Sequence, residues 1–335
     1  MNRSLSGLVA LLLAATLSTL AHANDSMARV GTGGIELVKS ADVRMASELL
    51  EISQERIRVT YQFINEGPAD IRTTVAFPMP DYGWSPGMSM LSENDYPLRP
   101  FKVLVDGQPV PTRFEHKALL KGKDVTAQLR RAGLKDDDIF ETFGCYREVC
   151  EYPKALQRKL EAIGAVAQGY PQWRVTETVY WEQRFPKDRP LRVEHEYKPL
   201  SGLIYRYPYQ QKTWVPPQER LPRPAARDGE DEVCLDEGAR AALDRRMQRE
   251  VDGGAKLLMV MLRDVEYILG TGRNWKGPIG DFTLRIEKAK PAEIVSLCFP
   301  GLSKRIDART LEFRAKDFVP QDRLVIHFYE VIGER

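Results

Sequence analysis

Apolar and polar residues alternate along several stretches in the first half of the chain. Between residues 57 and 63 every second side chain is apolar, and residues 71–77 repeat the pattern. Such alternation is typical of a strand with one buried face and one solvated face. The Asp-Gly pair at 106–107 favours a tight hairpin turn between two further runs. Residues 175–185 and 191–197 alternate in the same way, so the sequence predicts antiparallel strands.

A helical pattern interrupts these strands at residues 117–167. Helix-like sequence occurs around 125–133 and 138–143, and after Pro153 the apolar residues Leu156, Leu160 and Ile163 fall at helical spacing. A proline suits the first turn of a helix, so a third helix is expected to begin there. The segment therefore predicts a helical insertion carried by an antiparallel sheet. Such an insertion either forms a binding lid or covers a sheet edge.

Prolines and aromatic residues alternate at 202–232. This segment contains four aromatic candidates for a binding site: Tyr205, Tyr207, Tyr209 and Trp214. A stiff connector, whose rings pack on flanking domains, is one interpretation. The other is an aromatic platform for a glycan or a peptide, because flat rings give a large contact area.

The last third of the chain predicts a second set of elements. Asp236 is suited to capping a helix that runs to about residue 251, and alternating strands follow from residue 256 onward. We therefore expect a mainly β protein with two antiparallel β-sandwich-like domains, 24–201 and 233–335. The second domain contains one helix.

The first 23 residues have the organisation of a secretory signal. Arg3 precedes an apolar run at 8–20, and the segment ends in Ala21-His22-Ala23, the small-x-small pattern that signal peptidases cleave. The apolar run is too short for a stable membrane span, which needs about 20 residues. We expect cleavage before Asn24 and a periplasmic or secreted protein.

Composition narrows the range of functions. Loss of Arg3 with the signal would leave 48 basic and 47 acidic side chains, which gives no basic field for binding nucleic acid. No second long apolar run predicts a membrane span after cleavage. The chain lacks the common nucleotide, zinc-protease and serine-hydrolase motifs, so no cofactor and no metal are expected.

Four cysteines in an exported chain favour disulfides. Cys145 and Cys150 lie five residues apart, whereas Cys234 and Cys298 lie in the last third. Four cysteines allow three connectivities. We favour Cys145–Cys150 and Cys234–Cys298, because each pair then stays within one predicted domain. A zinc site is disfavoured, since no histidine lies near a cysteine in sequence.

Carboxylates offer the only candidates for catalysis. Glu194 and Glu196 lie on one face of a predicted strand, about 7 Å apart along it, and Glu177 and Glu182 lie on the preceding strand. Paired carboxylates in an interdomain cleft would suit an envelope hydrolase or a glycan-processing enzyme. A solvated stripe of charge is the alternative. Between them, His195 shares a face with apolar residues and is expected to be packed and hydrogen-bonded.

Several segments resemble an exported bacterial family known as domain of unknown function 4424. They are SADVRMASELLEIS from residue 40, IRVTYQFIN from 57, VAFPMPD from 75, GTGRNWKGPIGDFTL from 270 and DFVPQDRLVIHFY from 317. The resemblance implies a β-rich periplasmic or secreted protein, and it implies no activity or catalytic residue. We therefore expect a non-enzymatic binding or interaction protein, whose partner is an envelope protein, a peptide or a glycan.

Overall fold

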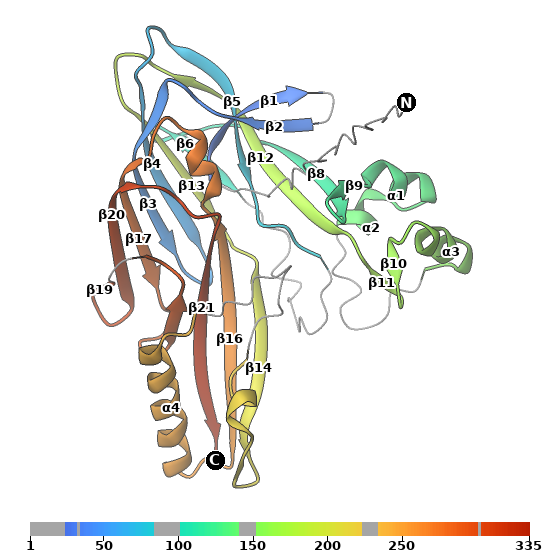
Figure 1. Ribbon diagram of the computed structural model, residues 1–335, viewed down its shortest axis with the longest axis vertical. Helices are drawn as coiled ribbons and strands as arrows, with labels where there is room; N and C mark the ends of the chain where they lie inside the picture. Colours follow the sequence, from blue (N-terminus) through green and yellow to red (C-terminus); the bar gives the residue numbers. More distant parts are fainter. Residues whose placement is uncertain (1–23, 32–33, 84–100, 141–151, 223–233, 301–302) are drawn as a thin grey trace, which may run out of the picture.

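Three β-sheets make up most of the computed structural model (Figure 1). The structure describes residues 24–31, 34–83, 101–140, 152–222, 234–300 and 303–335. The prediction of a mainly β protein is confirmed, and its antiparallel sheets are consistent with a sandwich-like arrangement.

The largest sheet has eight strands and draws on both halves of the chain. Its strands, in spatial order, are β19 (Lys304–Arg305), β20 (Thr310–Phe318), β17 (Ile279–Glu287), β3 (Val43–Ile52), β4 (Ile57–Asn65), β13 (Leu191–Tyr197), β6 (Lys102–Val105) and β7 (Gln108–Pro109). All neighbours are antiparallel except β3 and β17, which are parallel. The sheet therefore crosses the division expected between 24–201 and 233–335.

Two further sheets pack against it. The six-stranded sheet consists of β2 (Gly34–Val38), β1 (Ser26–Gly31), β5 (Ile71–Pro78), β12 (Arg174–Phe185), β8 (Arg113–Leu120) and β9 (Lys123–Asp124). The five-stranded sheet consists of β15 (Thr213–Trp214), β14 (Ser201–Gln210), β16 (Leu257–Ile268), β21 (Arg323–Glu334) and β18 (Ile294–Leu297). Two short 3-10 turns, Pro217–Glu219 and Gly270–Asn274, complete this part.

One hydrophobic core joins the three sheets. The inward side chains of β4, such as Val59 and Phe63, meet Phe77 from β5 and Ile326 from β21 in a single buried cluster. Alternation along β4 buries every second residue, because one face of the strand is in the core and the other faces solvent. The two halves of the chain thus share a core.

Helices cover the outside of the sheets. In the predicted insertion, α1 (Thr126–Ala132), α2 (Asp136–Phe140) and α3 (Lys154–Ala162) pack with the small hairpin of β10 (Val166–Ala167) and β11 (Tyr170–Pro171). Helix α4 (Glu237–Asp252) packs on the five-stranded sheet at the other side of the molecule (Figure 1). Asp236 caps α4, as expected, by accepting a hydrogen bond of 2.7 Å from the Ala239 amide.

A β-bulge in β3 changes which residues face the core. The pairing register with β4 shifts between Met45 and Ser47. Regular alternation after Met45 would turn Ser47 toward the core, but the bulge turns Glu48 inward instead. Gly280 lies beside the bulge, and a Cβ there would lie 2.7 Å from the Ala46 carbonyl oxygen. The close approach of the two backbones therefore requires glycine at position 280.

Candidate functional site

The four aromatic residues of the predicted connector lie on a strand and its hairpin partner. Residues 201–210 form β14, which pairs with β16 along its length except at a bulge. The first part of the expected connector, 202–210, is therefore sheet, because its backbone completes the five-stranded sheet. Residues 223–232 of the same prediction lie outside the described residues.

The structure separates the four rings into two pairs. Tyr207 is 38% exposed and meets the half-buried Tyr205 edge-to-face, with ring centroids 5.6 Å apart. Tyr209 is buried and lies 5.1 Å from Trp214, which carries the Arg220 guanidinium 4.7 Å above its ring. Tyr209 and Trp214 belong to the packing beneath α4. Tyr207 is therefore the most exposed of the four rings, Tyr205 and Trp214 are half-buried, and Tyr209 is buried.

The edge of β14 beside these two tyrosines is open among the described strands. Strand β15 pairs with β14 only at Tyr209 and Gln210. From Ile204 to Tyr207 no described strand lies on this side, although β16 pairs on the other. An open edge presents backbone donors and acceptors that another extended segment can pair with. Arg206 adds an exposed positive charge at the same place.

The carboxylates considered for catalysis lie on the solvent side of the eight-stranded sheet. Arg192 donates two hydrogen bonds, of 2.9 and 3.0 Å, to Glu194, and Arg58 donates one of 2.9 Å to Glu196. Partial burial opposes ionisation of Glu196, but Arg58 and Lys102 outweigh it and hold its pKa below the usual value. Both side chains are thereby arranged as ion-paired surface charges.

The two other carboxylates lie on β12. Glu177 is buried and lies 2.5 Å from the His116 Nε2 atom, while Glu182 accepts a hydrogen bond of 2.9 Å from the Thr74 hydroxyl. The ring of Phe140 lies 5.4 Å from that of His116. The His116–Glu177 pair is a contact between neighbouring strands that connects the sheet to the insertion.

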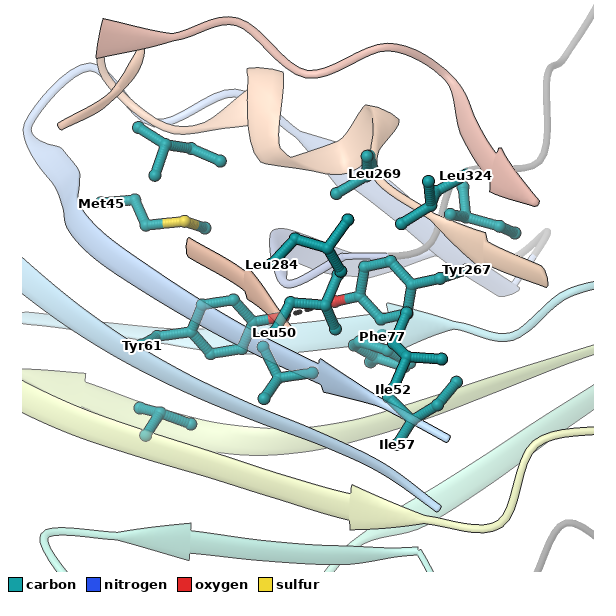
Figure 2. Close-up of a cluster of buried hydrophobic side chains, with 14 of the residues drawn as sticks. Met45, Leu50, Ile52, Ile57, Tyr61, Phe77, Tyr267, Leu269, Leu284 and Leu324 are labelled. Atoms are coloured by element: carbon teal, nitrogen blue, oxygen red, sulfur yellow. Dashed lines mark hydrogen bonds between the residues drawn. The ribbon is translucent and has the colours of Figure 1, made fainter. Parts of the chain in front are cut away.

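A cluster that the sequence did not predict lies in the main core. We call it the buried polar centre: Asn24, Asp25, Glu48, Tyr61, His195 and Tyr267, all at most 1% exposed. The Asn24 amide donates to Glu48 Oε2 at 3.1 Å, and the Tyr61 hydroxyl donates to Asn24 Oδ1 at 2.5 Å. Figure 2 shows Tyr61 and Tyr267 approaching each other, with their hydroxyls 3.0 Å apart.

The acidic groups of the buried polar centre are poorly compensated. Among the described residues, both Asp25 carboxylate oxygens and Glu48 Oε1 have no hydrogen-bond partner, and neither ring nitrogen of His195 has one. His195 Nε2 lies 3.5 Å from Asp25 Oδ1, too far for a well-formed hydrogen bond. The expected packing of His195 is therefore present, but the expected hydrogen bond is not.

Burial dominates the electrostatics of this centre. It raises the pKa of Glu48 to about 8, and contacts with Asn24 and Tyr267 oppose the shift only partly. Burial and then the Glu48 charge raise the pKa of Asp25 well above its usual value. Burial also lowers the pKa of His195 to about 3. His195 is consequently neutral at pH 7 and supplies no positive charge.

Two features explain why the alternation of apolar and polar residues did not predict the buried polar centre. Glu48 faces the core only because of the bulge in β3, which no local pattern announces. Asn24 and Asp25 precede the first strand, where apolar periodicity gives no information. The Ala-x-Ala pattern directly before Asn24 was the one available signal that this residue had a special position.

Other candidate sites are limited in the described part of the chain. A surface cavity of about 420 Å³ lies where β3, β17 and β20 end, and it is lined by residues that include Arg56, Arg285 and Glu51. Arg285 is already paired with Glu312 at 2.9 Å. Within the described ranges no cluster of three or more potential metal ligands occurs, and no helix is long and apolar enough to cross a membrane.

The predicted long-range disulfide is confirmed. Cys234 and Cys298 are bonded, with Cα atoms 5.1 Å apart and a sequence separation of 64. The bond attaches the segment before α4 to the segment after β18. Cys145 and Cys150 lie outside the described residues, so their pairing stays a prediction.

The family model for a domain of unknown function, DUF4424, matches residues 23–327. The chain belongs to this family. No curated protein matches it in sequence. The family match spans both groups of motifs on which the resemblance rests, and it starts one residue before Asn24.

Solved structures resemble the chain only distantly. A "putative nutrient binding protein" from Legionella pneumophila has a TM-score of 0.42 at 14% identity, covering 92% of this chain and 70% of its own. An M1 zinc metallopeptidase from Deinococcus radiodurans has a TM-score of 0.29 at 9% identity, covering 87% of this chain and 43% of its own. These low scores transfer no activity to this chain.

Proposed function

We propose that this protein is exported and binds an extended polypeptide segment of another protein along the edge of β14. The observation that carries the proposal is the edge from Ile204 to Tyr207, which no strand in the described part of the chain pairs with and which includes the exposed Tyr207. A peptide added there would pair its backbone with β14 and extend the five-stranded sheet.

The side chains along this edge suit peptide recognition. Tyr205 and Tyr207 form a two-ring surface that lies against the partner's side chains, and each ring loses little conformational freedom on binding. Arg206 and Lys212 are exposed nearby and favour a segment with acidic side chains. The export step is supported by the signal-like pattern of residues 1–23.

Site-specific photo-cross-linking tests the proposal in cells. Benzoylphenylalanine replaces Tyr207 in one strain. In a control strain it replaces Val319, which is 66% exposed and directly follows β20. We expect ultraviolet light to attach a polypeptide of defined mass at position 207 and not at 319. Adducts of equal yield at both positions, an adduct with a second copy of this chain, or adducts with glycan or lipid would contradict the proposal.

A double substitution then measures the contribution of the tyrosines. Tyr205→Ala with Tyr207→Ala should weaken binding of the cross-linked partner about thirtyfold, the effect of losing a hot spot worth about 2 kcal/mol. The thermal midpoint should stay close to that of the unmodified protein, because neither ring lies in a core cluster.

A further inference from the structure

We infer that the interior of the protein contains a binding site for its own processed N-terminus. Cleavage between Ala23 and Asn24 would release an α-ammonium group, and this group would bind the carboxylates of Asp25 and Glu48. The hydrolysis consumes one water molecule and yields a carboxylate at Ala23 and an amine at Asn24, which takes up a proton. This inference goes beyond the binding role proposed for β14.

Asn24 is already held inside the buried polar centre. Its side-chain amide donates to Glu48 Oε2 at 3.1 Å, and its carbonyl oxygen accepts a hydrogen bond from the Thr271 hydroxyl. Its side-chain oxygen accepts from the Tyr61 hydroxyl at 2.5 Å. The α-nitrogen of Asn24 is bonded to the Cα atom that carries this side chain, about 1.5 Å away, so it lies in the buried polar centre as well.

The two carboxylates lack the cation that such burial normally requires. Among the described residues no lysine or arginine forms an ion pair with Asp25 or Glu48, and three of their four oxygens have no hydrogen-bond partner. Buried carboxylates are ordinarily paired, because an isolated charge is poorly solvated in the core. The neutral His195 ring does not fill this role.

An α-ammonium group has the properties that the centre lacks. It is positively charged near neutral pH and has three N–H donors, enough to reach both carboxylates. One positive charge neutralises one carboxylate, and the other carboxylate retains its proton at neutral pH. The sequence places the predicted cleavage directly at this residue, since Ala21-His22-Ala23 precedes Asn24.

The architecture indicates why processing would matter for the fold. Asp25 and Ser26 follow Asn24 directly into β1, and the Trp275 indole donates to the Asp25 carbonyl at 2.6 Å. Asn274 donates to the Ser26 hydroxyl at 3.0 Å. The N-terminal residues thus connect β1 of the six-stranded sheet to the turn before β17. A bound ammonium group would stabilise this junction only after cleavage.

Amine reactivity provides the direct test. The processed protein is purified from the exported fraction and its N-terminus is confirmed by mass spectrometry. A second chain retains Ala23 as its first residue, and both are oxidised and fully folded. An α-amine-selective acylating reagent is applied at pH 7, and the labelled N-terminal peptide is quantified.

We expect the Asn24 amine to react at least about tenfold more slowly than the Ala23 amine, because a rise of one pKa unit lowers the free-amine fraction tenfold. In denaturant the two rates should become equal. Glu48→Gln in the processed chain should restore fast labelling, whereas the surface control Glu196→Gln should not.

Equal labelling rates in the two folded chains would overturn the inference, and so would an exported protein that begins elsewhere than at Asn24. If Glu48→Gln prevents folding, the comparison of the two unsubstituted chains still decides the question. The test concerns only the N-terminus, so a negative result leaves peptide binding at β14 to be judged by cross-linking at position 207.

Discussion

Glu194 and Glu196 point to solvent from strand β13, and each lies 2.9 Å from an arginine. His195 between them points inward and has no hydrogen-bond partner within the described ranges. A similar contrast occurs near the end of β14. Tyr207 is exposed, while Tyr209, two residues later and beyond a bulge, is buried against Trp214. In both strands, residues close in sequence lie in environments of opposite polarity.

The contrast shows where the unusual chemistry of this protein lies. Ion pairs on the outer face contribute little, because water already solvates their charges. In the buried polar centre the charges are fully desolvated, so each missing partner has a large energetic effect. Glu194 and Glu196, which the sequence singled out, are therefore ion-paired surface charges, and the unusual carboxylates are Asp25 and Glu48.

The largest expected effect comes from Glu48 in the chain that retains Ala23. The folded-state pKa of about 8 exceeds the usual 4.5, so the folded protein retains a proton that the unfolded chain releases. Its free energy of unfolding should fall by about 1.4 kcal/mol per pH unit between those values. Glu48→Gln should remove this part of the slope, leaving the part due to Asp25.

Urea unfolding at pH 5, 6, 7 and 8 measures this prediction. In the processed chain the slope should already be smaller, because the ammonium group stabilises the ionised carboxylate. The prediction fails if Glu48→Gln leaves the pH dependence of the Ala23-retaining chain unchanged.

His195 should produce a pH dependence of the opposite sign. Its folded-state pKa of about 3 lies below the usual 6.5, so its contribution to stability is complete above pH 6.5 and is lost as the pH falls. Between pH 6.5 and 4 the loss amounts to about 3 kcal/mol. His195→Leu should flatten the acid limb of the stability curve. Unfolding midpoints that fall equally in both proteins over this range would contradict it.

The fold was largely predictable because alternation reports directly on burial. The runs at 57–63, 71–77 and 191–197 all lie within the strands of the structure. Sequence could not show that β3 and β17 pair, since that contact joins segments over 200 residues apart. The expected division into two domains rested on composition, which does not reveal a shared sheet.

The candidate sites were predictable only in part. The aromatic content of 205–214 drew attention to β14, where regular alternation would place Tyr207 and Tyr209 on one face. The bulge between Arg206 and Tyr209 instead leaves Tyr207 exposed and Tyr209 buried. The buried polar centre was hidden because its members come from five separate segments. In addition, the bulge at Ala46 reverses the facing that a regular strand would give Glu48.

Tyr209 and Tyr207 offer a matched test of the two environments along β14. Tyr209→Ala should lower the free energy of unfolding by about 2 kcal/mol, because it leaves a cavity beside Trp214 and Leu258. Tyr207→Ala should change it by less than about 0.5 kcal/mol. Chemical denaturation of both variants at one pH measures the difference. Equal losses would show that the outer ring also belongs to the core.

Glu196→Gln should have a smaller effect on stability than Tyr209→Ala, with the sign opposite to that of Glu48→Gln. Burial opposes ionisation of Glu196, but Arg58 and Lys102 outweigh it and lower the pKa of this carboxyl group. The carboxylate therefore stabilises the fold above its unfolded-state pKa, and this stabilisation is lost as the pH falls. For this half-exposed pair we expect a loss of about 0.5 kcal/mol at pH 7 in low salt. The loss should shrink in 1 M salt, where exposed charges are screened over about 3 Å. Denaturation of the two glutamate variants in parallel, at low and high salt, measures both signs. A salt-insensitive loss of several kcal/mol at Glu196 would mean that charges on the outer face of β13 are as poorly solvated as those on its inner face.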